Sequence, residues 1–157
     1  RGVGRSKGQY DNGMGETQDL TAVIQQAQRR YPGYQLVLAG FSFGAYIALK
    51  AASSVQPNQL ITVAPPVNLF DFSQIQRPHC PWLLIQGNQD EVVPHHQVVN
   101  WVNRLINPPD MQILDGVSHF FHGHLNALKN TLQNKLARHM YNNSRLSSPQ
   151  FPQSAVQ

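Results

Sequence analysis

A serine lies at the centre of a five-residue motif that is typical of an acyl-transfer nucleophile. Gly40-Phe41-Ser42-Phe43-Gly44 fits the pattern G-x-S-x-G and stands between a predicted strand and a predicted helix. Such a turn is sharp and lifts the Ser42 hydroxyl out of the sheet, over the start of the helix. The backbone N–H of Phe43 could then bind the oxyanion that forms when Ser42 attacks a carbonyl carbon.

The two glycines of this motif are predicted to remove side chains that would clash where strand and helix approach each other. Both Gly40 and Gly44 are expected to serve in this way. The alternative is a Gly/Ser turn that only caps the helix. The buried strand before it and the apolar helix after it favour the nucleophile.

Two further residues have the types and positions needed to activate Ser42. Asp90 comes just past the carboxyl end of a buried strand, and His119 follows the next strand by a few residues. The carboxylate can orient the imidazole, which can take the serine proton and later protonate the leaving group. The chain order Ser, Asp, His therefore predicts a catalytic triad.

Each of these residues also has a plainer interpretation, as a solvated loop acid or a surface histidine. Glu91, next to Asp90, is expected to point elsewhere. His122 and His124 are assigned to the surface or to the start of a helix. The seven histidines form no zinc pattern, so we expect no metal and no cofactor.

The elements that must position these residues alternate between helices and strands. They are expected at 16–30 (helix), 35–41 (strand), 42–53 (helix), 60–63 (strand), 82–86 (strand), 94–106 (helix), 111–114 (strand) and 124–140 (helix). The strand at 35–41 is predicted to be buried on both faces because it is a continuous apolar run. The alternation indicates an α/β fold with three layers, in which helices cover both faces of a mostly parallel sheet.

Composition narrows the class of protein. The chain has 157 residues, the size of one domain, with 41% hydrophobic and 13% charged residues. The formal net charge is +4, but the basic residues are scattered, so no nucleic-acid partner is expected. No apolar run approaches the roughly 18 residues of a membrane span, and the single cysteine, Cys80, permits a cytoplasmic location.

Three segments resemble the characteristic parts of α/β-hydrolases. Residues 40–44 look like the nucleophile elbow, 87–94 like the acid turn and 116–121 like the histidine loop. The opening residues 1–6, Arg-Gly-Val-Gly-Arg-Ser, are similar to the loop that follows the fourth strand in that superfamily. Residues 13–19 resemble a small bacterial group related to dienelactone-hydrolase and esterase/peptidase-like proteins. The resemblance covers residues 1–140; residues 141–157, rich in Ser, Pro, Gln and Asn, are expected to be a disordered tail.

The resemblance implies that the first four strands precede Arg1, so that residues 1–140 are a partial domain comprising the elbow strand onward. The loop that gives the second oxyanion N–H would then be missing, and losing one such donor costs about 100- to 1,000-fold in rate. The chain is therefore expected to be a fragment that is unstable or weakly active by itself. Strand 35–41 would be an unpaired edge at which the chain can self-associate.

The function that follows is a serine hydrolase cleaving a carboxylic ester or related acyl bond of a small molecule. Peptidase, thioesterase or acyltransferase chemistry on the same triad is the first alternative. The second is an inactive fragment or interaction module that lacks half of the oxyanion hole.

Overall fold

The computed structural model describes the backbone of residues 1–146 and the side chains of residues 1–136. Its elements are, in chain order, α1 (Met14–Arg30), β1 (Val37–Phe41), α2 (Phe43–Val55), β2 (Gln59–Val63), β3 (Trp82–Gly87), α3 (His95–Val102), β4 (Asp110–Leu114) and α4 (Leu125–Leu146). Every expected helix and strand is present in the expected order.

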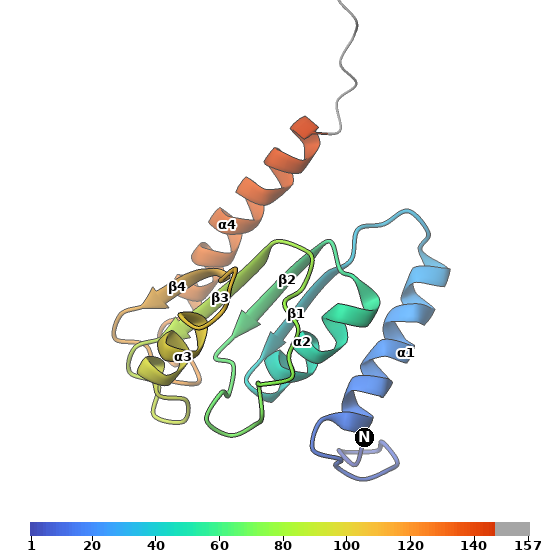
Figure 1. Ribbon diagram of the computed structural model, residues 1–157, viewed down its shortest axis with the longest axis horizontal. Helices are drawn as coiled ribbons and strands as arrows, with labels where there is room; N and C mark the ends of the chain where they lie inside the picture. Colours follow the sequence, from blue (N-terminus) through green and yellow to red (C-terminus); the bar gives the residue numbers. More distant parts are fainter. Residues whose placement is uncertain (147–157) are drawn as a thin grey trace, which may run out of the picture.

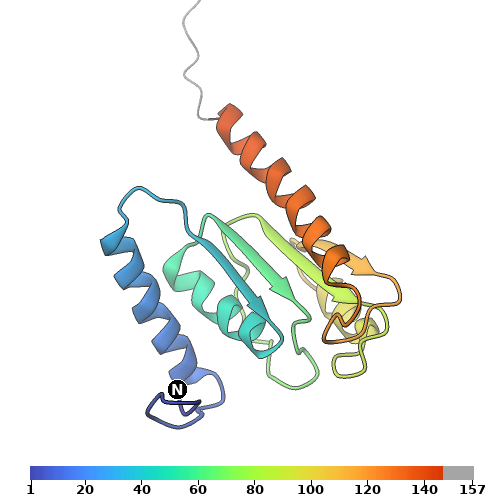
Figure 2. The same cartoon turned by 180° about the vertical axis from the view of Figure 1, so that it is seen from behind.

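The strands form one parallel sheet with the order β1-β2-β3-β4 in the described part of the chain. Helices α2 and α3 cover one face, and α4 covers the other (Figures 1 and 2). Helix α1 packs on α2 at the β1 end of the molecule (Figure 1). The predicted three-layer α/β/α class is confirmed.

Two apolar clusters hold the layers together, one on each face of the sheet. Alternate residues of β3 supply both, because successive side chains of a strand point to opposite faces. Trp82 and Leu84 join the cluster under α2 and α3, whereas Leu83 and Ile85 join the cluster under α4. All four side chains are buried. Strand β3 therefore runs through the middle of the core, which holds the residues at its carboxyl end firmly in place.

Helix α2 ends two residues later than expected, at Val55, and two other helices differ more. Helix α3 stops at Val102 rather than at 106, because Arg104 N–H and Leu105 N–H bond carbonyls three residues back and so tighten the last turn. Helix α4 continues to Leu146, since no Pro or Gly interrupts it before Pro149. The tail expected at 141–157 is therefore helical at its start, and residues 147–157 lie outside the described part.

Strand β1 is not buried on both faces, contrary to the prediction. Leu38 is buried beneath α2, but Val37 and Phe41 on the other face are 49% and 42% exposed. Within residues 1–146 the strand pairs with β2 on one side and with no strand on the other. The physical reason is that α4 lies over β2, β3 and β4 and does not reach this edge (Figure 2). Self-association at this edge stays a prediction.

The opening loop is tied down on the same side of the molecule. Arg1 makes two hydrogen bonds to the Asp19 carboxylate, at 2.8 and 2.9 Å, and these bonds lower the pKa of Asp19. Glu16 accepts the backbone N–H groups of Asp11 and Gly13. These contacts fix the opening loop against the first turns of α1.

No helix in residues 1–146 is long and apolar enough to cross a bilayer. Within the described side chains, no three His, Cys, Asp or Glu residues are grouped so that they could hold a metal ion.

Candidate active site

Ser42 sits on a strained turn between β1 and α2. Its φ of 50° lies in the left-handed region, which costs a non-glycine residue about 1–3 kcal/mol. Backbone hydrogen bonds hold it there: Ser42 N–H donates to Val63 O at 2.8 Å, and Ala45 N–H donates to Ser42 O at 2.9 Å. The Ser42 side chain makes no capping hydrogen bond to α2, so its Oγ is left for another partner.

That partner is His119. Its Nε2 lies 3.1 Å from Ser42 Oγ, although the two residues are 77 positions apart in the sequence. The other ring nitrogen, Nδ1, lies 3.0 and 2.9 Å from the two carboxylate oxygens of Asp90. The side chains of His119 and Asp90 are 3% and 0% exposed. The structure thus brings together the three residues that the sequence singled out, in a line that can pass a proton from Ser42 to a buried histidine–carboxylate pair.

The Asp90 carboxylate is held from three directions besides the histidine. Its Oδ1 accepts the backbone N–H groups of Val92 at 3.0 Å and Val93 at 2.7 Å. Its Oδ2 accepts the side-chain amide of Gln86 at 2.9 Å. Bonds of this kind stabilise a buried charge that has lost its water.

Glu91 takes part in the site, contrary to the expectation that it points elsewhere. Its Oε2 accepts the backbone N–H of His119 at 3.1 Å. Hydrogen bonds from its own N–H and from that of His119 lower the pKa of the Glu91 carboxyl. Glu91 therefore holds the main chain of the histidine loop while Asp90 holds its imidazole.

The acid turn and the histidine loop are also joined through Asn88 and Gly87. Asn88 Oδ1 accepts the Gly116 N–H at 2.8 Å, and Asn88 Nδ2 donates to Asp115 Oδ1 at 2.6 Å. A Cβ on Gly87 would stand 2.2 Å from Val117 O, so only glycine permits this close approach. No pattern in the sequence singles out Asn88 for this contact.

His122 and His124 lie outside this arrangement. His122 is exposed, and its carbonyl oxygen lies 3.0 Å from His124 Nδ1. Neither ring contacts Ser42 or Asp90 in the described structure, in agreement with their assignment to the surface or the helix start.

The chain matches one protein-family model and is similar to several solved structures. Residues 1–77 match the family model described as serine aminopeptidase, S33. The chain is similar to an α/β serine hydrolase without a lid from Xanthomonas campestris, with 43% identity and a TM-score of 0.84 over 88% of this chain and 63% of that one. It is also similar to an α/β serine hydrolase homologue from Coxiella burnetii, with 47% identity and a TM-score of 0.82 over 87% of this chain and 65% of that one. The chain belongs to the α/β-hydrolase superfamily.

A curated relative is an uncharacterised protein of Rickettsia prowazekii (strain Madrid E), 37% identical over 131 residues. The match covers 77% of this chain and 55% of the relative. The chain thus spans about half the length of that relative and under two thirds of the two solved chains.

In this α/β-hydrolase site, one backbone donor lies next to the nucleophile in the sequence, at the start of α2. Phe43 is the first residue of α2, where an N–H has no intrahelical acceptor. In the described structure no other group accepts it either. Its N–H is therefore unpaired and available to a negatively charged oxygen.

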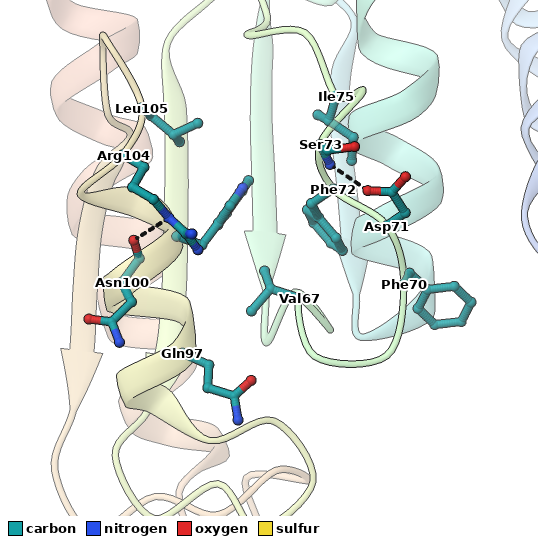
Figure 3. A pocket seen from close by; sticks show the side chains of 11 residues that line it. Val67, Phe70, Asp71, Phe72, Ser73, Ile75, Gln97, Asn100, Arg104 and Leu105 are labelled. Carbon is teal, nitrogen blue, oxygen red and sulfur yellow. Dashed lines mark hydrogen bonds between the residues drawn. The ribbon is translucent and has the colours of Figure 1, made fainter.

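A cavity of about 540 Å³ lies beside the elbow rather than over it. One wall is α3 with the turn after it, and the other is the connection between β2 and β3 (Figure 3). Neither Ser42, Asp90 nor His119 lines it. Its link to the site is Phe70, whose ring lies 5.3 Å from that of Phe43 between centroids. We locate the chemistry at the hydrogen-bonded triad, because the cavity holds none of its groups.

The two elbow glycines differ in what they allow, and this corrects the expectation that both prevent a clash. A Cβ on Gly40 would lie 2.2 Å from Gly44 O and 2.6 Å from Ala45 N, which are backbone atoms that cannot turn aside. A Cβ on Gly44 would meet nothing within 4 Å in the described structure. Gly44 points away from the strand, so the close approach depends on Gly40.

Replacing Gly40 by Ala is expected to destabilise the full-length protein by about 4 kcal/mol, because the helix start must move off the strand. Gly44→Ala is the matched control and is expected to be neutral or to stabilise α2 by up to about 1 kcal/mol. Urea unfolding of both variants measures the difference. Equal losses of unfolding free energy would contradict the close approach at Gly40.

Proposed function

We propose that the protein is a serine hydrolase that cleaves a carboxylic ester or a related acyl bond of a small molecule by way of an acyl-enzyme on Ser42. The observation that carries the proposal is the continuous contact from Ser42 Oγ to His119 Nε2, and from His119 Nδ1 to Asp90. Membership of the α/β-hydrolase superfamily supports it, as does the description of the similar Xanthomonas campestris protein as a serine hydrolase.

The proposed first half-reaction forms the acyl-enzyme. His119 Nε2 accepts the proton of Ser42 as Oγ attacks the carbonyl carbon, and Asp90 stabilises the imidazolium. The electron pair of the carbonyl moves to its oxygen, where the Phe43 N–H can bind the charge. His119 then gives its proton to the leaving oxygen, the C–O bond breaks, and the alcohol departs.

In the second half-reaction, water takes the place of the alcohol. His119 Nε2 accepts a proton from water as the water oxygen attacks the acyl carbon. The bond between the acyl carbon and Ser42 Oγ then breaks, Oγ takes the proton from His119, and the carboxylic acid departs and ionises in solvent. The site can be open to solvent, because the connection 64–81 contains no helix or strand and the similar Xanthomonas campestris protein is described as having no lid.

Peptidase chemistry is the second candidate, because residues 1–77 match the family described as serine aminopeptidase. The same four groups would act, with an amine rather than an alcohol as leaving group. Because the chain spans about half of that curated relative, the choice between the two is tested on the full-length protein.

The test is labelling and turnover by the full-length protein. We expect one equivalent of a fluorophosphonate probe to attach to Ser42, and p-nitrophenyl esters to be hydrolysed faster than aminoacyl p-nitroanilides or acyl thioesters of the same acyl group. Faster anilide turnover would favour the peptidase, and faster thioester turnover a thioesterase. Absence of both labelling and turnover would contradict a hydrolase and favour an interaction module.

A further inference from the structure

Gln86 is an amide in a place where the strand pattern calls for an apolar side chain. It is the fifth residue of β3 and lies on the face that Trp82 and Leu84 share, toward α2 and α3. The residue is fully buried, with 0% exposed. Burying an amide is unfavourable unless it makes hydrogen bonds, so its contacts should explain its presence.

The nitrogen of the Gln86 amide faces three acceptors. Nε2 lies 2.9 Å from Asp90 Oδ2, 3.1 Å from Val93 O and 3.3 Å from Gly87 O. A turned amide would set its oxygen against a carboxylate and two carbonyls, so this orientation is the one that chemistry permits. The other end, Oε1, is buried without a partner in the described structure. Gln86 thus leaves its acceptor unpaired while its donors serve the acid turn.

The atom that Gln86 holds is the one that faces the histidine most closely. Asp90 Oδ2 lies 2.9 Å from both Gln86 Nε2 and His119 Nδ1. The other oxygen, Oδ1, is fixed by the backbone of Val92 and Val93. Gln86 also binds the carbonyl of Val93, whose N–H binds Asp90. Without the amide, only the two hydrogen bonds to Oδ1 and the contact with His119 would oppose rotation of the carboxylate about its Cβ–Cγ bond.

We infer that Gln86 is a positioning residue, which fixes the Asp90 carboxylate and through it the His119 ring in line with Ser42. This inference rests on the proposed function. It assigns Gln86 no contact with substrate. A small rotation of Asp90 would move the imidazole off the serine hydroxyl, and misplacement by about 1 Å can cost roughly 100-fold in rate.

The test compares Gln86→Met with Gln59→Met in the full-length protein. Methionine keeps the length of glutamine and lacks its donors. Gln59 is the matched control, because it too is a buried glutamine with an unpaired polar atom, at the start of β2 opposite the exposed end of β1 and far along the strand from Ser42. We expect Gln86→Met to lower kcat by roughly 100-fold with KM nearly unchanged. We expect Gln59→Met to leave both constants unchanged.

Thermal melting, read together with kcat, distinguishes a positioning role of Gln86 from a purely structural one. Gln86→Met should stay folded at the assay temperature but melt somewhat below wild type, because Asp90 Oδ2 and Val93 O lose a buried donor. A lowered melting temperature with unchanged kcat would overturn the inference. Equal losses of kcat in the two methionine variants would also overturn it.

Gln86→Glu adds a pH signature. A protonated glutamic acid can donate its O–H to Asp90 Oδ2, whereas an ionised one repels the Asp90 carboxylate. We therefore expect the activity of Gln86→Glu relative to wild type to fall as pH rises. A constant ratio across the pH range would count against the inference.

Fluorophosphonate labelling tests the proposed function, whereas an NMR signal of His119 tests the positioning role of Gln86. If the wild-type protein is not labelled by a fluorophosphonate, the proposed function fails. The downfield NMR signal of the His119 Nδ1 proton, which is bonded to Asp90, still reports on positioning in that case. We expect this signal to shift or broaden in Gln86→Met and to stay in place in Gln59→Met. An unchanged signal in Gln86→Met would overturn the role of Gln86.

Discussion

Replacing Ser42 by Ala is expected to lower kcat of the full-length protein by about 10⁶-fold, because the proposed mechanism has no other nucleophile. The change should leave folding almost intact. The Ser42 side chain makes no capping bond to α2, and the backbone bonds that hold the elbow do not use Oγ. The measurement is hydrolysis of the best ester in the panel, together with mass spectrometry of the fluorophosphonate adduct.

The matched control for this change is Ser53→Ala. Ser53 is an exposed serine near the other end of the same helix, and its hydroxyl bonds the carbonyl of Lys50. Its loss should alter neither labelling nor rate. If Ser42→Ala still takes up the probe, or if Ser53→Ala loses activity to the same extent, Ser42 is not the nucleophile.

Replacing His119 is expected to have an effect of similar size, about 10⁶-fold in kcat, since serine and histidine act as one unit in such a site. His119→Gln is the better variant for this test. The ring of His119 is buried between Phe41 and Phe120, at centroid distances of 5.1 and 5.0 Å, so truncation to Ala would also leave a hole. Rates are measured with the same ester, and folding by thermal melting.

His122→Gln supplies the matched control, because this exposed histidine comes from the same loop and contacts Phe120 from the outside. It should retain wild-type kcat. An inactive His122→Gln together with an active His119→Gln would show that the wrong histidine was assigned.

Much of the fold could be predicted because its signals are local. The apolar runs at 82–86 and 60–63 indicated buried strands, and the structure buries both completely. Each strand is followed by a helix or a polar turn, which is the pattern of a parallel sheet. The uncovered face of β1 had no such signal, since it depends on where α4 comes to lie.

The candidate site was predictable in outline for a geometrical reason. The carboxyl ends of parallel strands meet at one edge of the sheet, so polar residues that follow them are brought together. Ser42, Asp90 and His119 each follow a different strand, and in the structure His119 contacts both of the others. Their catalytic roles stay predictions until the variants above are measured.

The residues that surround this triad could not be predicted in the same way. Glu91 reaches the N–H of His119 across 28 residues, and this contact depends on the path of two loops rather than on any pattern along the chain. Gln86 did carry a signal, a polar residue at the end of an apolar run, but only the fold shows that its amide meets Asp90.

The elbow shows which features follow from the sequence motif and which follow from tertiary packing. The pentapeptide by its residue types was enough to indicate the turn and its nucleophile, because few sequences tolerate a serine with positive φ between a strand and a helix. That Gly40 is crowded by the helix backbone while Gly44 faces open space followed from the packing of α2 on β1. A motif specifies the local backbone, whereas the neighbours of each side chain are set by how the elements pack.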